Sequence, residues 1–457
     1  MDPATTPTII PRDQHEISRA NISPNALKVL YRLNGAGYEA YLVGGGVRDL
    51  LLGREPKDFD IATDASPEEV RKVFRNCRLI GRRFRLAHVH FGREIIEVAT
   101  FRGGMEVDAE EGDEEDEVGS SGDRVVENGM ILRDNTYGSM EEDAFRRDFT
   151  VNSLYYTTRD FSVVDYTGGL ADLKAGRLRL IGDPWQRYRE DPVRMLRAVR
   201  FAAKLGFRID PDCEEPIFEL GHLLAQVPSA RLFEEVLKIF LGGSAVAGYE
   251  LLRHYGLFGH LFPATEAALA IEEQHFPRTF VLRALENTDL RVAEDKPVTP
   301  AFLFGALLWE PTRLLAAEVL ASGECGSELH ALQLAGEEVT RRQVERVALP
   351  KRFSLPMREI WDMQARLPRR SGKRALVLAS HPRFRAAYDF LLLRNESGES
   401  LQELCDWWTA FQENDDNGRV ALLRSAERSG EADPEKRRRR RRGGRRRSGK
   451  AAPSAAE

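Results

Sequence analysis

Short apolar runs in the first third of the chain predict a sheet whose strands are separated by helices. Residues 39–43 predict a strand that ends in the apolar run Tyr41 to Val43, and residues 58–62 alternate polar and apolar side chains. Residues 79–102 alternate in the same way on either side of Gly92-Arg93, which predicts a hairpin. Residues 163–169 predict a last strand and a turn, so this α/β part is expected to close shortly after them.

Apolar residues spaced by three and four predict helices in the rest of the chain. Ser23-Pro24 predicts a helix start, because Ser caps a helix and Pro fits its first turn. Ser66-Pro67-Glu68-Glu69 has the form of a capping box. The strongest helical pattern spans 185–207 and stops at Gly206. From 208 to about 424 the spacing is helical throughout, without intervening strand runs.

These patterns predict an α+β protein in which a head with a mixed sheet and helices is followed by an all-α neck and body. The expected segments are a flexible N-terminal lead-in at 1–23, the head at 24–172 with a disordered acidic insertion at 103–129, the neck at 173–250, the body at 251–424, and a disordered Arg-rich tail at 425–457. The insertion and the tail lack the apolar residues that a folded core requires.

Composition narrows the class of protein. The 457 residues, of which 42% are hydrophobic and 30% charged, suffice for two or three globular domains. No apolar run approaches the length of a membrane span, and the polar N-terminus lacks the core of a secretion signal. The four cysteines lie far apart, which indicates neither a metal-binding pair nor a disulfide framework. These features predict a cytoplasmic protein with reduced thiols.

Charge is distributed unevenly along the chain. The net charge is −5, and subtracting the eleven Lys and Arg of residues 436–450 leaves −16 on the remainder. Residues 106–117 contain nine Asp and Glu. An acidic body with a basic tail predicts an anionic polymer as partner, which the tail engages locally.

A second concentration of basic residues lies in the helical region. Its members are Arg341, Arg342, Arg346, Lys351, Arg352, Arg369, Arg370, Lys373 and Arg374. With Phe353 and Phe384 nearby, they predict a groove that follows polynucleotide phosphates, and ordinary surface decoration is the alternative.

Residues 42–62 combine the residue types that carry most chemical information. Gly44-Gly45-Gly46 follows a predicted strand, and such a turn lets backbone N–H groups approach a phosphate closely. Asp58 and Asp60 lie two residues apart on the next predicted strand, so their carboxylates are expected to project from one face. Paired carboxylates repel each other unless a cation lies between them, and Asp oxygens together with substrate phosphates suit Mg²⁺. A tight turn and a solvated carboxylate explain each part alone, but the combination and its order predict a nucleotidyl-transfer site.

Several polar residues further along allow two interpretations each. Glu97 lies in an apolar strand and either completes the Asp cluster or faces water or an arginine on an edge strand. Arg147 and Asp148 either serve a triphosphate or form a surface ion pair at a helix end. Asp191 and Arg194 either read the edge of a base or belong to a solvated helix face.

Four segments resemble, in content and order, the signatures of class II tRNA nucleotidyltransferases and bacterial poly(A) polymerases, which have polymerase-β-type nucleotidyltransferase heads. They are Gly-Gly-Gly-Val-Arg-Asp-Leu-Leu-Leu-Gly at 44–53, Asp-Phe-Asp at 58–60, Arg-Arg-Asp-Phe-Thr-Val-Asn-Ser-Leu at 146–154, and Glu-Asp-Pro-Val-Arg-Met-Leu-Arg-Ala-Val-Arg-Phe-Ala at 190–202. Within this branch, residues 81–92, 350–353 and 381–391 and the basic tail resemble the poly(A) polymerases.

The resemblance implies an enzyme that adds AMP from ATP to RNA 3′ ends without a template, which promotes decay of the RNA; a CCA-adding tRNA nucleotidyltransferase is the alternative. It implies site residues in three groups. Asp58 and Asp60 would hold two Mg²⁺ ions, with Glu97 and Asp148 as supporting catalytic carboxylates. The nucleotide phosphates would be lined by Gly44, Gly45, Arg48 and Arg147, and the ATP would be read and fixed by Asp191, Arg194 and Arg197.

The implied partners are the 3′ ends of mRNA and other transcripts, bound by the helical body, and RNA-decay machinery contacted through the basic tail. A protein that binds RNA but carries a vestigial transferase site is a further alternative. The presence of all four acidic residues argues against it.

Overall fold

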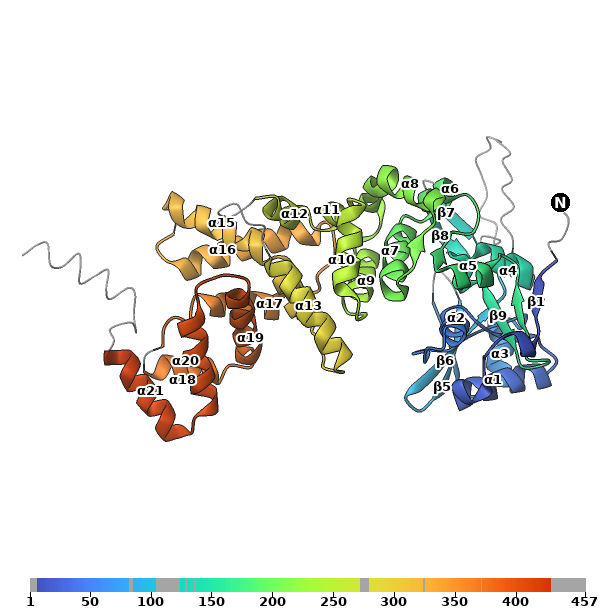
Figure 1. Cartoon of the computed structure of the whole chain (residues 1–457), viewed down its shortest axis with the longest axis horizontal. Coiled ribbons are helices and arrows are strands. Elements are labelled where there is room, and N and C mark those ends of the chain that lie inside the picture. The colour runs from blue at the N-terminus through green and yellow to red at the C-terminus, as the bar shows by residue number, and fades with distance from the viewer. Residues whose placement is uncertain are drawn as a thin grey trace, which may run out of the picture. The chain divides into compact units, whose positions relative to one another are not determined.

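The computed structural model describes residues 6–81, 85–103, 124–127, 130–134, 137–271, 279–323, 325–370 and 372–428 (Figure 1). The chain forms two compact units, Met1–Val227 and Pro228–Glu457. None of the helices in the described ranges has the length and apolar character that a membrane span requires.

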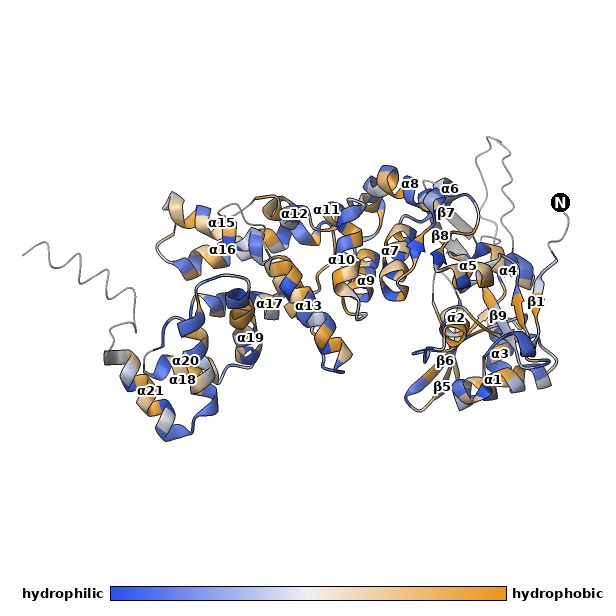
Figure 2. Ribbon diagram, viewed as in Figure 1, coloured by the Kyte–Doolittle hydropathy of each residue, from blue (hydrophilic) through white to orange (hydrophobic). Residues whose placement is uncertain are grey.

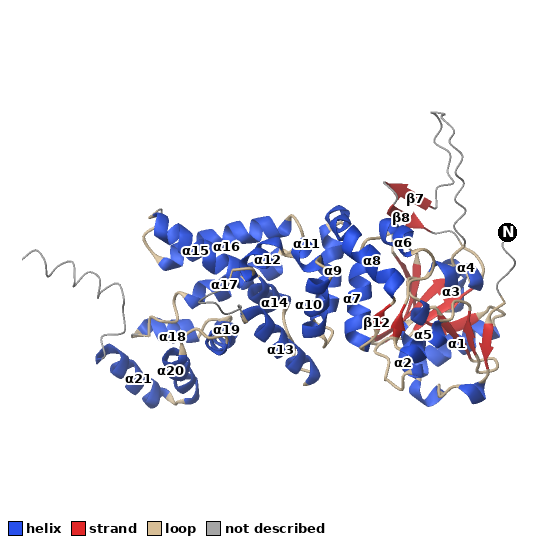
Figure 3. Ribbon diagram, turned by 45° about the horizontal axis from the view of Figure 1, so that its top comes forward, coloured by secondary structure: helices blue, strands red, loops and turns tan. Residues whose placement is uncertain are grey.

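A mixed sheet of eight strands forms the centre of the first unit (Figure 3). In order across the sheet these are β1 (Thr8–Ile10), β10 (Val163–Asp165), β9 (Leu154–Thr157), β2 (Ala40–Val43), β3 (Asp60–Thr63), β6 (Glu94–Thr100), β5 (Leu86–Phe91) and β4 (Cys77–Ile80). Neighbouring strands are antiparallel except β3 and β6, which are parallel. The register places Asp60, at the start of β3, opposite Glu97 in the middle of β6.

Helices and short elements connect and cover these strands. They are η1 (Arg12–Gln14), η2 (Arg19–Asn21), α1 (Pro24–Gly35), α2 (Gly45–Leu51), α3 (Pro67–Val73), α4 (Met140–Arg146), η3 (Thr150–Asn152), α5 (Gly169–Ala175), α6 (Pro184–Glu190), α7 (Val193–Leu205), α8 (Pro211–Leu220) and η4 (Gly221–Gln226).

The helix ends follow the local chemistry that the sequence indicated. Ser23 Oγ accepts hydrogen bonds from the first N–H groups of α1, and Ser66 and Glu69 form the predicted capping box of α3. Gly206 ends α7 in the left-handed region at φ +73°. The hairpin at Gly92-Arg93 is also confirmed, between β5 and β6.

A buried cluster lies behind the strands that carry the glycine turn and Asp60. It consists of Val43, Ala62, Phe101, Ala144, Tyr155 and Val164. Because these side chains come from β2, β3, β9, β10, α4 and the end of β6, they hold the two ends of the glycine segment in fixed relation.

The described residues of the second unit form helices. These are α9 (Ser229–Phe240), α10 (Ala245–His254), α11 (Leu257–Leu261), α12 (Pro263–Leu269), α13 (Phe280–Ala293), α14 (Pro300–Leu307), α15 (Trp309–Ser322), α16 (Glu328–Val344), α17 (Lys351–Gln364), α18 (Lys373–Ala379), α19 (Phe384–Glu396), α20 (Gln402–Glu413) and α21 (Asp416–Arg428). Hydrophilic and hydrophobic residues alternate along most of them (Figure 2). Trp361 is buried and donates a hydrogen bond from Nε1 to the Gly305 carbonyl at 3.0 Å. The predicted α+β class, a mixed-sheet head followed by helices, is confirmed.

The prediction of a flexible lead-in at 1–23 is wrong for the residues that the structure describes from residue 6 onward. β1 pairs with β10, and Ile10, Ile17 and Ile22 are buried. These scattered apolar residues give no periodic signal. An edge strand needs few of them, because the neighbouring strand supplies its hydrogen-bond partners.

The prediction of a disordered insertion at 103–129 is wrong in part. Residues 124–127 form β7, which pairs antiparallel with β8 at 130–134, whereas 104–123 lie outside the described residues. Asn128-Gly129 between two apolar runs is a typical hairpin sequence, and the acidic composition of the preceding segment concealed it.

Other boundaries also differ from the predicted ones. The compact unit that contains the head extends to Val227, beyond the predicted end at residue 172. Within the predicted all-α neck, β11 (Arg177–Leu178) and β12 (Arg208–Ile209) form a short parallel pair. The helix expected at 185–207 is two helices, α6 and α7, because Pro192 cannot continue α6. At the C-terminus, α21 continues to Arg428, and the tail after it lies outside the described residues.

Candidate active site

The glycine turn lies against residues from three other parts of the first unit. Gly44 has φ +68°, a conformation that side chains rarely adopt, and a Cβ there would lie 3.6 Å from Arg147 Nη1. A Cβ on Gly46 would lie 3.5 Å from the Asp58 carbonyl oxygen. The turn therefore brings its backbone beside both Arg147 and the loop that carries Asp58.

Asp60 lies among other carboxylates. It is half-buried at the start of β3, and burial together with Glu97 and Asp58 raises its pKa to about 6, against the effects of Arg147 and His88. His88 Nε2 lies 3.3 Å from Glu97 Oε2. Because β6 lies between β3 and β5, Glu97 is not on an edge strand as one interpretation required, and it is close enough to Asp60 to raise the pKa of that carboxyl.

Asp58 does not lie on the strand that the sequence predicted for it. The strand begins at Asp60, and Asp58 is exposed in the preceding loop. The alternation argument for a shared face therefore does not apply, yet the effect of Asp58 on the pKa of Asp60 shows that the two carboxylates are close.

Arg147 is held as a cation beside the glycine turn. Its Nε donates to Tyr155 Oη at 2.9 Å, and its Nη2 donates to Asp143 Oδ2 at 2.9 Å. Tyr155 Oη also donates to Asp143 Oδ2, at 2.6 Å. Burial alone would lower the pKa of Arg147, but Tyr155 and Asp143 raise it above its ordinary value. The ion pair that sequence left open for Arg147 is formed with Asp143, is half-buried, and includes Tyr155.

Arg48 is buried beneath the glycine turn. Its Nε and Nη2 donate to Asp49 Oδ1 at 2.9 and 2.7 Å, and its Nη1 donates to Asn152 Oδ1 at 2.6 Å. Its guanidinium carbon also lies 5.3 Å from the centre of the Phe201 ring on α7. With 2% of its surface exposed, Arg48 joins the turn to its surroundings and has little surface for a phosphate.

Asp148 forms an ion pair with α7. Its Oδ2 accepts from Arg197 Nε at 2.7 Å, and its Oδ1 accepts from the N–H of Phe149 at 2.8 Å. Asn152 Nδ2 donates to the same Oδ1 at 3.4 Å. Burial would raise the pKa of Asp148, but Arg197 outweighs it and the pKa is about 2. Arg48, Asn152, Asp148 and Arg197 thus form a continuous chain of polar contacts from the glycine turn to α7.

Asp191 and Arg194 lie at the junction of α6 and α7. Asp191 ends α6 in extended conformation, and its carbonyl accepts from the Arg194 N–H at 2.9 Å. Arg194 Nη1 donates to the Arg187 carbonyl at 2.7 Å and to Glu190 Oε2 at 3.1 Å. These contacts fix the Arg194 side chain along α6.

Sequence reasoning missed the residues that orient these groups. Arg187 is buried and donates from Nη2 to the carbonyls of Arg146 and Arg147, at 2.9 and 2.6 Å. Burial, with Arg194 nearby, lowers the pKa of Arg187 to about 10. Asp143 could have been found from the sequence, because it lies one helical turn before Arg147.

Before substrate binds, the carboxylates at this site provide only some of the ligands that a metal ion needs. Among the described residues, no group of three or more His, Cys, Asp and Glu is arranged to hold a metal ion. Asp58 and Asp60 provide two adjacent carboxylates, and Mg²⁺ is commonly bound by one or two carboxylates plus substrate phosphates. The residues therefore fit Mg²⁺ that arrives with a nucleotide.

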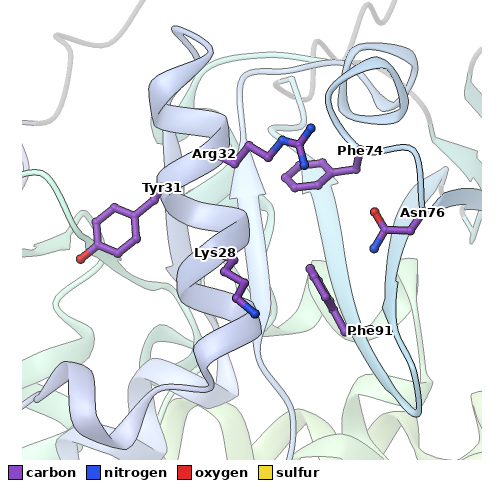
Figure 4. A pocket seen from close by; sticks show the side chains of 6 residues that line it. All are labelled: Lys28, Tyr31, Arg32, Phe74, Asn76 and Phe91. Atoms are coloured by element: carbon purple, nitrogen blue, oxygen red, sulfur yellow. The ribbon is translucent and has the colours of Figure 1, made fainter.

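A pocket of about 430 Å³ lies elsewhere in the first unit (Figure 4). Its lining residues are Lys28, Tyr31, Arg32, Phe74, Asn76 and Phe91. Arg32 and Lys28 lie over the rings of Phe74 and Phe91, at 5.1 and 5.9 Å from the ring centres. None of these residues belongs to the candidate active site.

The groove predicted from the basic residues of the helical body is not supported at three positions. Arg341 and Arg342 both donate to Glu338, so they belong to surface ion pairs. Phe384 is buried, with its ring centre 5.1 Å from that of Trp408, and cannot stack on a base.

Comparisons with known proteins match most of the chain. A family described as Poly A polymerase head domain matches residues 40–179, Probable RNA and SrmB- binding site of polymerase A matches 206–269, and Polymerase A arginine-rich C-terminus matches 325–446. The chain is 55% identical to Poly(A) polymerase I of Escherichia coli O6:H1 over 412 residues, which are 89% of this chain and 86% of that protein.

More distant relatives share the fold or part of the sequence. A CCA-adding enzyme of Bacillus licheniformis is 36% identical over 236 residues, 52% of this chain and 55% of that protein. A solved structure described as tRNA-processing enzyme complex 3 superposes with a TM-score of 0.56 at 22% identity, covering 83% of this chain and 90% of that one. That structure supports the fold.

Proposed function

Because the chain belongs to the bacterial poly(A) polymerase family, it transfers AMP from ATP to RNA 3′ ends without a template, and we propose which of its residues bind each substrate. The observation that carries the assignment is the crowding of Asp60 by Glu97 and Asp58 beside the glycine turn. Such crowding is unfavourable in the free protein and favourable once a cation is bound.

Asp58 and Asp60 hold two Mg²⁺ ions in this proposal, and Glu97 supports Asp60 from the neighbouring strand. Mg²⁺ bound there would make the RNA 3′-hydroxyl a better nucleophile and neutralise charge on the departing phosphates. His88 keeps the Glu97 carboxylate in place through the contact of 3.3 Å.

The reaction is an in-line displacement at the α-phosphorus of ATP. The 3′-oxygen of the RNA forms a bond to that phosphorus, and its proton passes to solvent water. The bond from the α-phosphorus to the oxygen that bridges to the β-phosphate breaks, which releases pyrophosphate. The backbone of Gly44 and Gly45 and the guanidinium of Arg147 lie where they can bind the phosphates of ATP. Positioning and charge neutralisation suffice, so no covalent enzyme intermediate is required.

Asp191 and Arg194 read the adenine base, whereas Arg197 acts indirectly. Asp191 offers acceptors and Arg194 offers donors, which suits the amino group and ring nitrogen of adenine. Arg197 holds Asp148 and so fixes α7 relative to the glycine turn. Arg48 is assigned the same kind of positioning role, since it is buried.

The helical second unit and the tail complete the proposal. The second unit contributes to RNA binding, and the basic tail of residues 436–450 contacts RNA or the RNA-decay machinery. The four cysteines are free and buried, which is compatible with a reducing cytoplasm as the site of action.

A nucleotide-selection assay tests this function. The purified full chain is supplied with Mg²⁺, a single-stranded RNA with a free 3′-hydroxyl, and each nucleoside triphosphate separately. Long products with ATP alone are expected. Asp60→Asn should yield none, whereas the exposed control Asp13→Asn should behave as wild type. Addition restricted to tRNA that lacks its 3′ end, with CTP also used, would establish the CCA-adding alternative instead.

A further inference from the structure

The loop that precedes Asp58 is hydrogen-bonded to the C-terminal end of α7. Arg54 Nη1 donates to the Lys204 carbonyl at 3.3 Å, and Arg54 Nη2 donates to the Leu205 carbonyl at 3.4 Å. These carbonyls belong to the last turn of α7, where a cation is favourable. The same loop carries Lys57, three residues after Arg54.

Several cations lie close to one another on this surface. Lys204 Nζ lies 3.7 Å from Asp49 Oδ2, but the other oxygen of Asp49 already accepts two hydrogen bonds from Arg48. One carboxylate thus serves two cations. The pKa of Lys204 is lowered by burial and further by Arg48, Lys57 and Arg200, although Asp49 opposes this, so these cations are close enough to repel each other.

Lys57, Arg200 and Lys204 are called the basic patch below. Lys57 and Lys204 are exposed, and Arg200 is half-buried with its guanidinium carbon 4.1 Å from the centre of the Phe201 ring. Repulsion among cations is relieved when an anion binds between them. The patch therefore has the charge of a site for phosphate groups.

The position of the patch indicates which phosphates it takes. Lys57 directly precedes Asp58, where the RNA 3′-hydroxyl must arrive. The phosphates of ATP are already assigned to Gly44, Gly45 and Arg147, which lies beside Gly44. The remaining anionic substrate is the RNA strand just before its 3′ end.

We propose that Lys57, Arg200 and Lys204 bind the backbone phosphates of the last nucleotides of the RNA and direct its 3′ end to Asp58 and Asp60. This inference rests on the proposed function and adds the subsite for the RNA primer. Because it involves only the backbone, it applies to any single-stranded sequence.

Charge-removing variants test the patch. Lys57→Gln, Lys204→Gln and the double variant are compared with Lys174→Gln, an exposed lysine on α5 of the same unit. The probe is a labelled oligoadenylate RNA with a free 3′-hydroxyl. Its KM is measured alongside that of ATP, and its affinity without ATP is measured by fluorescence anisotropy at several salt concentrations. Thermal unfolding checks that each variant folds.

Each single variant should raise the KM for RNA roughly three- to fivefold, as expected for loss of one exposed charge contact. The KM for ATP should change less than twofold, and the control should match wild type. The double variant should also flatten the log–log salt dependence of RNA affinity by about 1.4, at about 0.7 for each phosphate contact with a single strand.

An unchanged KM and salt slope for RNA, or an equal rise in the KM for ATP, would overturn the proposal. Failure of the proposed function would look different, since wild type would then add no AMP at all. The anisotropy measurement would still test the patch in that case. Lys57→Gln is the cleaner variant, because Lys204 also contacts Asp49.

Discussion

The ion pair between Asp148 and Arg197 should stabilise the first unit by about 2 kcal/mol, and a double-mutant cycle can measure it. The pKa of Asp148 is about 2 instead of 3.8, a difference that corresponds to roughly 2.5 kcal/mol. The Arg197 side chain is 32% exposed, so solvent screening reduces the estimate to about 2 kcal/mol.

The cycle consists of Asp148→Asn, Arg197→Gln and the double variant, each unfolded with denaturant at pH 7. Hydrogen exchange of the α7 amides reports on the helix directly. The exposed pair Arg283–Glu286, with 53% and 40% of the two side chains exposed, is the matched control and should show a coupling below about 0.5 kcal/mol. Additive effects of the two substitutions at Asp148 and Arg197 would refute the reasoning.

The same pair predicts a pH dependence with a definite sign. The folded-state pKa of Asp148 is depressed, so its contribution is complete above the unfolded-state pKa near 3.8 and is lost as the pH falls towards 2. Wild type should therefore lose about 2 kcal/mol more than Asp148→Asn across that window. At neutral pH, Asp148→Asn should also raise the KM for ATP, because α7 carries Arg194, which we propose reads the adenine base. An unchanged KM for ATP would show that the ion pair does not affect nucleotide binding.

Three further predictions concern catalysis, selection and recruitment. Asp60→Asn should abolish AMP incorporation yet stabilise the metal-free protein at pH 8 by about 3 kcal/mol, since the folded-state pKa of about 6, against 3.8, means that ionised Asp60 destabilises the fold above that pH. A lower unfolding midpoint would contradict the crowding by Glu97 and Asp58. Arg194→Ala should raise the KM for ATP and reduce discrimination against CTP about tenfold, as expected for loss of a charged hydrogen bond. RNA binding should not weaken. An equal loss of ATP binding and RNA binding would indicate that this face of α7 contacts RNA. Truncation after Ala432 should raise the RNA concentration for half-maximal rate and flatten its salt dependence; parallel log–log lines for the two proteins would exclude RNA as the ligand of the tail.

Local signals in the sequence predicted the parts of the site that depend on neighbouring residues. The glycine turn, the helix after it and the strand that begins at Asp60 follow from residue types a few positions apart. The caps at Ser23 and Ser66 followed for the same reason. The position of Asp58 before the strand did not, because a strand boundary depends on its partner strand as well as its own residues.

Contacts between distant residues escaped prediction. Arg48 meets Asn152 across 104 positions, and Asp148 meets Arg197 across 49. Periodicity and motif spacing describe one segment at a time, so they could not show that Arg48 is buried. Glu97 illustrates the same limit, since only the strand order shows that its strand is central.

Arg194 and Arg197 lie one turn apart on α7 but belong to different contact networks. Arg197 forms its ion pair with Asp148, whereas Arg194 donates hydrogen bonds to Arg187 and Glu190 at the end of α6. Substitutions at Arg194 can therefore be explored in a library without loosening the link between α7 and the glycine turn. If Arg194 reads the base as proposed, nucleotide choice can therefore be varied at Arg194 while Arg197 keeps α7 in place.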